Sequence, residues 1–208
     1  MPRTEEAFQQ IREASRRKIL DGALRVFASK GTEATMADVA KEAGVSQGLA
    51  YRYFPSKEAV LSELVHEVTD AGGGFYERVK QVKGTAKERL DFLLVQMMRA
   101  IRETPEYYQL LSHVLRDGNV PDELRAVVAK NGEAVRSTIR RLIVEAQARG
   151  DIARDDPEQL LTALLAIVYG LERPTPGPRR AVGKKNFPDP KIVLRMLKPD
   201  ADWGRDSK

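Results

Sequence analysis

Apolar residues recur at intervals of three and four along most of the chain, the spacing of the buried face of an α-helix. Ile19, Ala23 and Phe27 belong to one such stripe. Short clusters of glycine, proline, serine and threonine separate the stripes and mark helix ends. No segment shows the alternating pattern of a β-strand, so the chain is predicted to be all-α. After a loose arm over residues 1–10, helices are predicted near 7–30, 35–43, 47–54, 57 onward, 85–103, 105–117, 121–149, 157–171 and 190–197.

The segment after the first helix carries the signals of two short helices joined by a tight turn. Thr35 is expected to cap the first of them, with Asp38 three residues later as its capping-box partner. Gly44 suits the left-handed conformation that ends such a helix. Ser46 is expected to cap the second helix, and Pro55 stops it because the residue before a proline is pushed out of helical geometry. This arrangement predicts a helix-turn-helix.

The second short helix also carries an aromatic-rich pattern, Ser-x-Gly-x-x-Tyr-x-Tyr-Phe-x-x-Lys. Its fixed positions are Ser46, Gly48, Tyr51, Tyr53, Phe54 and Lys57. Upstream, a helix with a glycine stop is formed by Ile19, Leu20, Ala23, Phe27 and Gly31. Together these residues resemble the DNA-binding signature of the tetracycline-repressor (TetR) family of bacterial transcription regulators. One departure lies at Leu49 and Ala50, where many members carry threonine and leucine, so a hydroxyl contact to phosphate or base is missing.

The resemblance implies a DNA-binding transcriptional regulator, in the first instance a repressor that a small-molecule ligand releases from a palindromic operator. It divides the chain into a three-helix helix-turn-helix DNA-binding domain over residues 1–56 and a helical ligand-binding and dimerisation domain over residues 57–208. The implied partners are double-stranded DNA, a second copy of the chain and an unknown small-molecule effector, with no cofactor. Two alternatives stay open: a regulator without small-molecule input, and an activator.

The first residues of a recognition helix are the ones that reach base edges in the major groove. Gln47 is suited to adenine, Arg52 to guanine and Leu49 to a thymine methyl group. The hydroxyl groups of Tyr51 and Tyr53 and the ammonium group of Lys57 are expected to bind backbone phosphates, and such contacts fix the register of the protein on DNA without reading its sequence. The alternative for the aromatic residues is core packing, which is adopted for Phe54. The predicted DNA-contacting residues are Thr35, Ser46, Gln47, Gly48, Leu49, Tyr51, Arg52, Tyr53 and Lys57.

Two further groups of basic residues have two interpretations each. Arg12, Arg16, Arg17 and Lys18 lie in the first half of the first helix, where they form either a solvated charged face or a phosphate contact. The Pro/Gly-rich basic loop over residues 172–188 is either a solvated connection or a contact to DNA or an acidic partner.

The helix predicted over residues 121–149 has two polar residues, Asn131 and Thr138, on nearly the same face as its apolar stripe. Buried polar groups need partners, and a bound small molecule is one such partner. Methionines on a facing helix would supply an adaptable apolar wall. The alternative for each candidate is an ordinary core position. The candidate effector-binding residues are Met97, Met98, Tyr107, Tyr108, His113, Asn131, Thr138 and Tyr169.

The helix predicted over residues 157–171 is apolar around most of its circumference, so it must be covered on all sides. One side is expected to face its own core and the other a second copy, with Leu164 and Val168 pointing outward and help from residues 190–197. A two-fold partner would present two recognition helices to a palindrome. The predicted dimer-interface residues are Leu160, Leu164, Ile167, Val168 and Leu171.

Three consecutive glycines, Gly72 to Gly74, interrupt the helix that begins at Lys57. Glycine inside a helix costs about 1 kcal/mol relative to alanine. The glycines have three interpretations: close packing of another helix, a helix that ends near Ala71 and restarts near Phe75, or a hinge that bends when a ligand binds.

Composition excludes several other classes of protein. The net charge of +5 comes mostly from residues 172–208, which hold ten Lys and Arg against five Asp and Glu, so it says little about nucleic acid. The absence of cysteine rules out disulfides and thiolate metal sites. No signal peptide or bilayer-spanning run is present, so a cytoplasmic protein without a membrane partner is expected. No catalytic motif matches, and the lone pair Glu63 and His66 is weak evidence for a metal enzyme.

Overall fold

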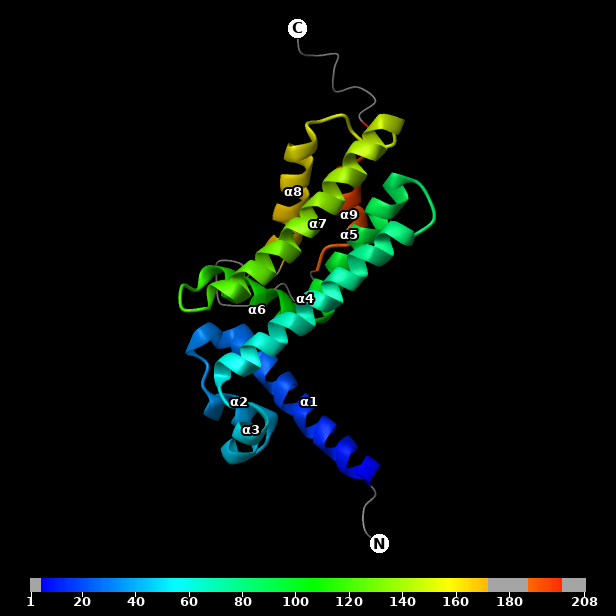
Figure 1. The fold of residues 1–208 in the computed structure, drawn as a ribbon. Helices are drawn as coiled ribbons and strands as arrows, with labels where there is room; N and C mark the ends of the chain where they lie inside the picture. The colour runs from blue at the N-terminus through cyan, green and yellow to red at the C-terminus, as the bar shows by residue number, and fades with distance from the viewer. Residues whose placement is uncertain (1–4, 172–186, 200–208) are drawn as a thin grey trace. The chain divides into compact units, whose positions relative to one another are not determined.

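The computed structural model describes residues 5–171 and 187–199, and every regular element in these ranges is helical (Figure 1). In chain order the elements are α1 (Glu5–Lys30), the short 3₁₀ helix η1 (Gly31–Glu33), α2 (Met36–Ala43), α3 (Gln47–Tyr53), α4 (Lys57–Gln81), α5 (Ala86–Glu103), α6 (Pro105–Arg116), α7 (Asp122–Arg149), α8 (Pro157–Gly170) and α9 (Pro190–Arg195). The all-α prediction is confirmed.

The chain forms two compact units that are discontinuous in sequence. Unit 1 comprises Met1–Ala71 and Glu106–Lys130, and unit 2 comprises Gly72–Pro105 and Asn131–Lys208. The helices α4 and α7 therefore each begin in unit 1 and end in unit 2. This structural division differs from a functional boundary at residue 56, which stays a prediction.

Unit 1 is built around the helix-turn-helix. In α1 the buried positions begin at Ile19 and continue through Phe27, and this half of the helix contacts α2, which in turn contacts α3. The core extends into α4 and is completed by side chains from α6, from the loop that follows it and from the first turns of α7. These completing side chains are Leu110, Val114, Val120, Leu124 and Val128. Helices α1 to α4 thus share one hydrophobic core with side chains from residues 110–128, which lie far from them in sequence.

Unit 2 is formed by the second halves of α4 and α7 together with α5, α8 and α9. Helix α5 contacts both α8 and α9, and α9 lies beside α5 in Figure 1. The backbone N–H of Ala153 donates to the carbonyl of Leu197 at 3.0 Å, which ties the segment after α9 to the α7–α8 connection. Buried positions on α5 include Leu90, Leu94 and Met98, so α5 is the central helix of this core.

Several predicted helix ends are confirmed. Thr85 caps α5 through a capping box, and Asp156 caps α8 with a proline in the first turn. One expectation was wrong, because residues 5–10 are helical rather than a loose arm. The short helix η1 has no counterpart among the predicted elements. Helix α4 continues through Gly72–Gly74, which excludes one of the three interpretations of these glycines, a helix that ends near Ala71 and restarts near Phe75. Within the described residues, none of the helices combines the length and apolar character needed to cross a membrane.

Candidate nucleic-acid interface

Helix α2 begins with the predicted capping box. The Thr35 hydroxyl accepts a hydrogen bond from the N–H of Asp38 at 3.1 Å, and the N–H of Thr35 donates to the Asp38 carboxylate at 3.1 Å. Lys30 Nζ lies 2.7 Å from the same carboxylate. The hydrogen bonds from Lys30 and then from Thr35 lower the pKa of Asp38 to about 2. The hydroxyl of Thr35, a predicted DNA contact, is therefore already engaged in the cap of α2.

The turn after α2 depends on two glycines. Gly44 adopts the left-handed conformation, with φ of 60°, and its N–H bonds to the carbonyls of Ala40 and Lys41, as predicted. Gly22 lies where α1 crosses the end of α2, and a methyl group added there would lie 2.8 Å from the backbone nitrogen of Ala43. No real side chain tolerates that separation, so the approach of the two helices requires glycine at this position.

Helix α3 presents the predicted recognition residues to solvent. The Ser46 hydroxyl caps it by accepting from the N–H of Leu49 at 3.2 Å, as expected. Ala50 is fully buried against the core, and Phe54 is buried after the end of the helix. Tyr53 and Leu49 are partly buried, and the exposed positions are Ser46, Gln47, Gly48, Tyr51 and Arg52. The capped and packed inner face leaves an outer face of side chains that can hydrogen-bond to DNA.

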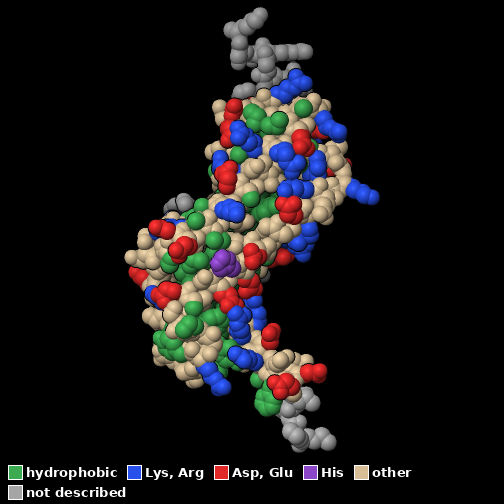
Figure 2. All heavy atoms as spheres, viewed as in Figure 1, with side chains coloured by type: hydrophobic (Ala, Val, Ile, Leu, Met, Phe, Trp, Pro, Cys, Tyr) green, Lys and Arg blue, Asp and Glu red, His purple; other side chains and the backbone are tan. Residues whose placement is uncertain are grey.

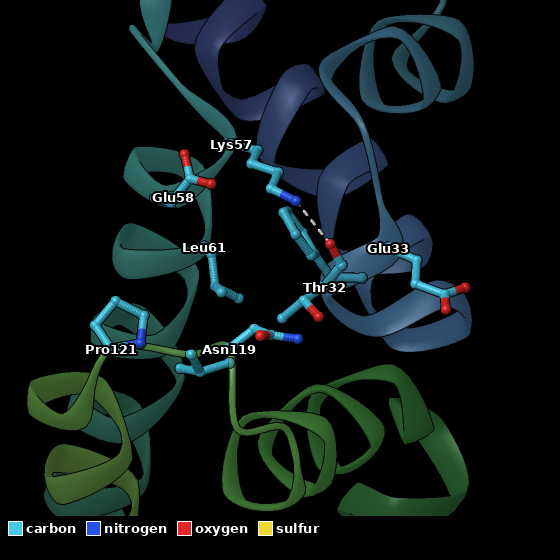
Figure 3. Close-up of a pocket in the computed structure, with 9 residues that line it drawn as sticks. Thr32, Glu33, Lys57, Glu58, Leu61, Asn119 and Pro121 are labelled. Atoms are coloured by element: carbon cyan, nitrogen blue, oxygen red, sulfur yellow. Dashed lines mark hydrogen bonds between the residues drawn. The ribbon is translucent and has the colours of Figure 1, made fainter.

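Lys57 lies at the start of α4 and is partly buried. Its ammonium group donates to the carbonyl oxygen of Thr32 at 2.7 Å (Figure 3). The Thr32 hydroxyl donates to the Asp117 carboxylate, which lowers the pKa of Asp117. Beside these bonds is a cavity of about 320 Å³ lined by Phe27, Thr32, Glu33, Lys57, Glu58, Leu61, Asn119, Val120 and Pro121. Lys57 therefore links α4 to η1, a connection that its place in the motif did not indicate.

The basic residues of α1 are mostly neutralised within unit 1. Arg16 pairs with Glu63, and Arg17 pairs with both Asp21 and Glu67. The hydrogen bond that Arg17 donates to the Asp21 carboxylate is the main cause of a raised pKa of Arg17. Figure 2 shows the same feature on one face of the protein, where Lys and Arg alternate with Asp and Glu instead of forming a single basic patch. Overall charge is thus a poor guide to the DNA-binding face.

The eight predicted effector residues are divided between the two units. Tyr107, Tyr108 and His113 lie in unit 1, where Nε2 of His113 donates to the carbonyl of Ala28 at 3.1 Å in the Nε2–H tautomer. Thr138 in unit 2 is buried, and its hydroxyl donates to the carbonyl of Ala134 at 2.8 Å. The remaining predicted effector residues of unit 2 are Met97, Met98, Asn131 and Tyr169.

Of the two polar residues of the α7 stripe, Thr138 therefore has a local hydrogen-bond partner, and Asn131 is only partly buried. The 320 Å³ cavity described above is lined by none of the eight residues. A role of these residues in binding an effector stays a prediction.

Helix α8 packs against unit 2 through Leu161, Leu164, Leu165 and Val168. Leu164 and Val168 are at most 1% exposed, which corrects the expectation that they point outward: they belong to the protein's own core. Leu160, Ile167 and Leu171 are partly exposed. These three residues remain the accessible part of the predicted dimer interface.

These features define a class of protein: a helix-turn-helix DNA-binding protein whose recognition helix is held by caps and a shared core. Residues 19–64 match the family described as bacterial regulatory proteins, tetR family. The chain is 31% identical over 161 residues to the HTH-type transcriptional repressor Rv1474c of Mycobacterium tuberculosis, covering 74% of this chain and 78% of that protein. The chain belongs to the TetR family of transcriptional regulators.

Solved structures agree with this assignment in fold. The ketosteroid regulator KstR2 of Mycobacterium tuberculosis has a TM-score of 0.70 at 21% identity, over 89% of this chain and 95% of that one. FadR of Bacillus subtilis, solved with stearoyl-CoA, has a TM-score of 0.54 at 24% identity, over 75% and 84% of the two chains. The members of the family are transcriptional regulators rather than enzymes. These regulators bind DNA operators, act as dimers and bind small molecules. The DNA-binding function predicted from the sequence is confirmed.

Proposed function

We propose that this protein is a dimeric repressor that reads a palindromic operator through α3 and leaves it when a small molecule binds. The outer face of α3 carries the proposal. Gln47 and Arg52 are exposed on a helix whose inner residue Ala50 is fully buried, so the two side chains are free to reach bases while the helix stays fixed. Amide and guanidinium groups form bidentate hydrogen bonds to adenine and guanine.

The other predicted residues around α3 would set affinity. The phenol of Tyr51, which is 47% exposed, and the hydroxyl of Ser46 are suited to phosphate oxygens. A methyl group added at Gly48 would meet nothing within 4 Å, so the helix can approach the DNA backbone closely there. The ammonium of Lys57 has three donors and uses one on Thr32, which leaves donors for a phosphate.

Dimerisation is proposed to use the partly exposed apolar residues of α8. Ile167 and Leu171 lie one helical turn apart, beside Leu160 two turns earlier. A charged residue at Ile167 would face the partner, whereas one at Leu164 would disturb the core of unit 2. Two copies related by a two-fold axis would present their α3 helices to half-sites about one helical turn apart.

The response to an effector is proposed to use a hinge at the glycines of α4. A side chain at Gly72 would meet Asn131 at 3.5 Å, one at Gly74 would meet Arg78 at 3.5 Å, and one at Gly73 would meet nothing. These are ordinary contacts or open space, so packing does not require glycine at any of the three positions. The glycines begin at the residue where the chain passes from unit 1 into unit 2.

Helix α7 makes the same passage between Lys130 and Asn131, and Gly132 follows immediately with nothing within 4 Å of its added side chain. The remaining crossing, between Pro105 and Glu106, falls at the start of α6. All three crossings therefore lie at glycines or at a helix boundary. Dihedral changes at such points are what a hinge absorbs, and an effector shifts the hinge by binding one of its two states more tightly.

Selection of DNA sites from a random library, followed by binding measurements on variants, tests this function. The parent protein should select a palindrome. Gln47→Ala and Arg52→Ala should each relax one position of it, at a loss of roughly 1–3 kcal/mol per base contact. Tyr51→Phe should weaken every site alike. Selection of no common sequence, or an unchanged preference in both α3 variants, would contradict the proposal.

A thermal-shift screen against metabolites, with acyl-CoA thioesters among them, tests the effector. A compound that raises Tm and also releases DNA identifies the ligand class. If no compound does both, the alternative of a regulator without small-molecule input is favoured.

A further inference from the structure

The cations of α1 differ sharply in whether they have a counter-charge. Four of them form ion pairs within unit 1, namely Arg16, Arg17, Arg25 and Lys30. The other two cations of α1, Arg12 and Lys18, have no carboxylate within ion-pair distance among the described residues, and of these two Lys18 is the one whose ammonium lies at the turn after α2. A cation that is already paired gives up that partner when it binds a phosphate, whereas an unpaired one gives up only its hydration. Lys18 is therefore better suited than its four paired neighbours to contact DNA.

Lys18 also lies at a particular place, the turn of the helix-turn-helix. Its side chain is exposed, and its ammonium nitrogen is 3.5 Å from the carbonyl oxygen of Gly44. The same nitrogen would lie 3.6 Å from a side chain added at Gly44. A separation of 3.5 Å is at the limit of a hydrogen bond, so the contact holds the ammonium near the turn without consuming its capacity to donate.

The turn is close to the start of the recognition helix. Gly44 is two residues before Ser46, the N-cap of α3. Two residues span at most about 7.6 Å between their Cα atoms, and the major groove that receives a recognition helix is about 12 Å wide between its phosphate walls. When the first residues of α3 reach base edges, a cation at this turn lies within reach of the groove wall.

We infer that Lys18 binds a backbone phosphate at the edge of the groove that α3 enters. The inference rests on the proposed use of α3 to read the operator. A phosphate contact carries no sequence information, so Lys18 sets affinity and register. Because a bound cation displaces one condensed counterion from the DNA, it contributes about 0.9 to the salt slope, that is, to the dependence of log K on log salt.

The experiment compares two variants that change net charge equally. Lys18→Gln removes an unpaired cation, and Arg25→Gln removes a cation of the same helix that pairs with Glu42 at 2.6 Å. Fluorescence anisotropy measures binding of each protein to the selected operator and to a scrambled duplex between about 50 and 200 mM KCl. Lys18→Gln should lower the magnitude of the salt slope by about 0.9 on both duplexes. Over this fourfold rise in salt, the parent should then lose about 3.5 times more affinity than the variant.

Arg25→Gln should leave the salt slope unchanged, and Lys18→Arg should restore the parent slope. Equal slopes for Lys18→Gln and the parent overturn the inference, as does an equal reduction in Arg25→Gln, which would make the effect one of net charge. A fall in the Tm of Lys18→Gln without a change in slope would assign Lys18 to the end of α2 instead, since a cation there also stabilises the helix dipole. Failure of the proposed function looks different, because the parent itself would then show no preference for the operator.

Discussion

A methyl group added at Gly22, where α1 packs against α2 of the helix-turn-helix, would lie 2.8 Å from the backbone of Ala43, whereas one added at Gly73, in α4, would meet nothing within 4 Å. Gly44 has a left-handed backbone, but Gly72, Gly73, Gly74 and Gly132 have ordinary helical ones. Glycine in the first region is required by space or by conformation. In the second region it only lowers the stability of the helix that contains it.

Glycine therefore has two different structural roles in this protein. Around α2, the glycines fix the geometry of a DNA-binding motif, so replacing them should be harmful. At the crossings between the units, they weaken two helices at positions where alanine would fit, so replacing them should be stabilising. A helix that carries glycine where alanine would fit is less stable than it could be, and such a segment is a candidate for conformational change.

The largest effect is expected from replacing Gly72, Gly73 and Gly74 together by alanine. Each substitution should stabilise the helix by up to about 1 kcal/mol, for a total of up to about 3 kcal/mol. Denaturant unfolding should show the gain, and hydrogen exchange should slow at residues 70–76. Operator affinity should persist, while release by the compound found in the screen is blunted. A triple variant that releases DNA as readily as the parent would remove the hinge.

Gly22→Ala should act in the opposite direction. The added methyl group forces α1 away from the end of α2, and such overpacking costs about 1–3 kcal/mol. Thermal melting should show a lower Tm, and operator binding should weaken because the approach of α1 to α2 supports α3. An unchanged melting curve would mean that the two helices separate easily and that space does not select glycine there.

Gly44→Ala should be harmful for a conformational reason. An L-residue in the left-handed region costs roughly 1–2 kcal/mol, while no atom closer than the flexible end of Lys18 stands in the way. Gly132→Ala is the matched control, since the same methyl group goes into a right-handed helix with open space around it. It should stabilise the protein by up to about 1 kcal/mol. Equal shifts in Tm for the two variants would mean that the left-handed backbone at Gly44 does not require glycine more than the helix at Gly132 does.

The smallest effect is expected from low pH, and it concerns the stability of unit 1. The pKa values of Asp38, Glu58 and Asp117 are all lowered there. A lowered pKa means that these carboxylates stabilise the folded state above their ordinary pKa, and that this contribution is lost as pH falls below about 4 towards the lowered value. NMR signals of α2 should weaken in that range. Asp38→Asn should reduce the pH dependence, and a variant as acid-sensitive as the parent would contradict the assignment to this cap.

Helix ends were predictable because their signals are local. Thr35 with Asp38, Ser46, and Asp156 before Pro157 each form a cap from residues within three positions of one another. The exposure of Gln47, Gly48 and Arg52 on α3 was predicted from their place at the start of the recognition helix, whereas Leu49 is partly buried.

The pairs Arg16–Glu63 and Arg17–Glu67 join residues 47 and 50 positions apart, so no local pattern could reveal them. The burial of Leu164 was also missed, because a helix that is apolar all round does not show which side faces the core. The sequence left open whether α4 breaks at its three glycines, because local propensity is a weak guide in a long helix.

The discontinuous make-up of unit 1 has a consequence for building chimaeric regulators. A graft of residues 1–56 onto another family member would leave behind Leu110, Val114 and Val120, which complete the core around Phe27. It would also break the link from Thr32 to Asp117. A graft that exchanges residues 1–71 and 106–130 together keeps these contacts within one donor. DNA specificity in this protein should therefore be transferable only as a pair of segments, never as residues 1–56 alone.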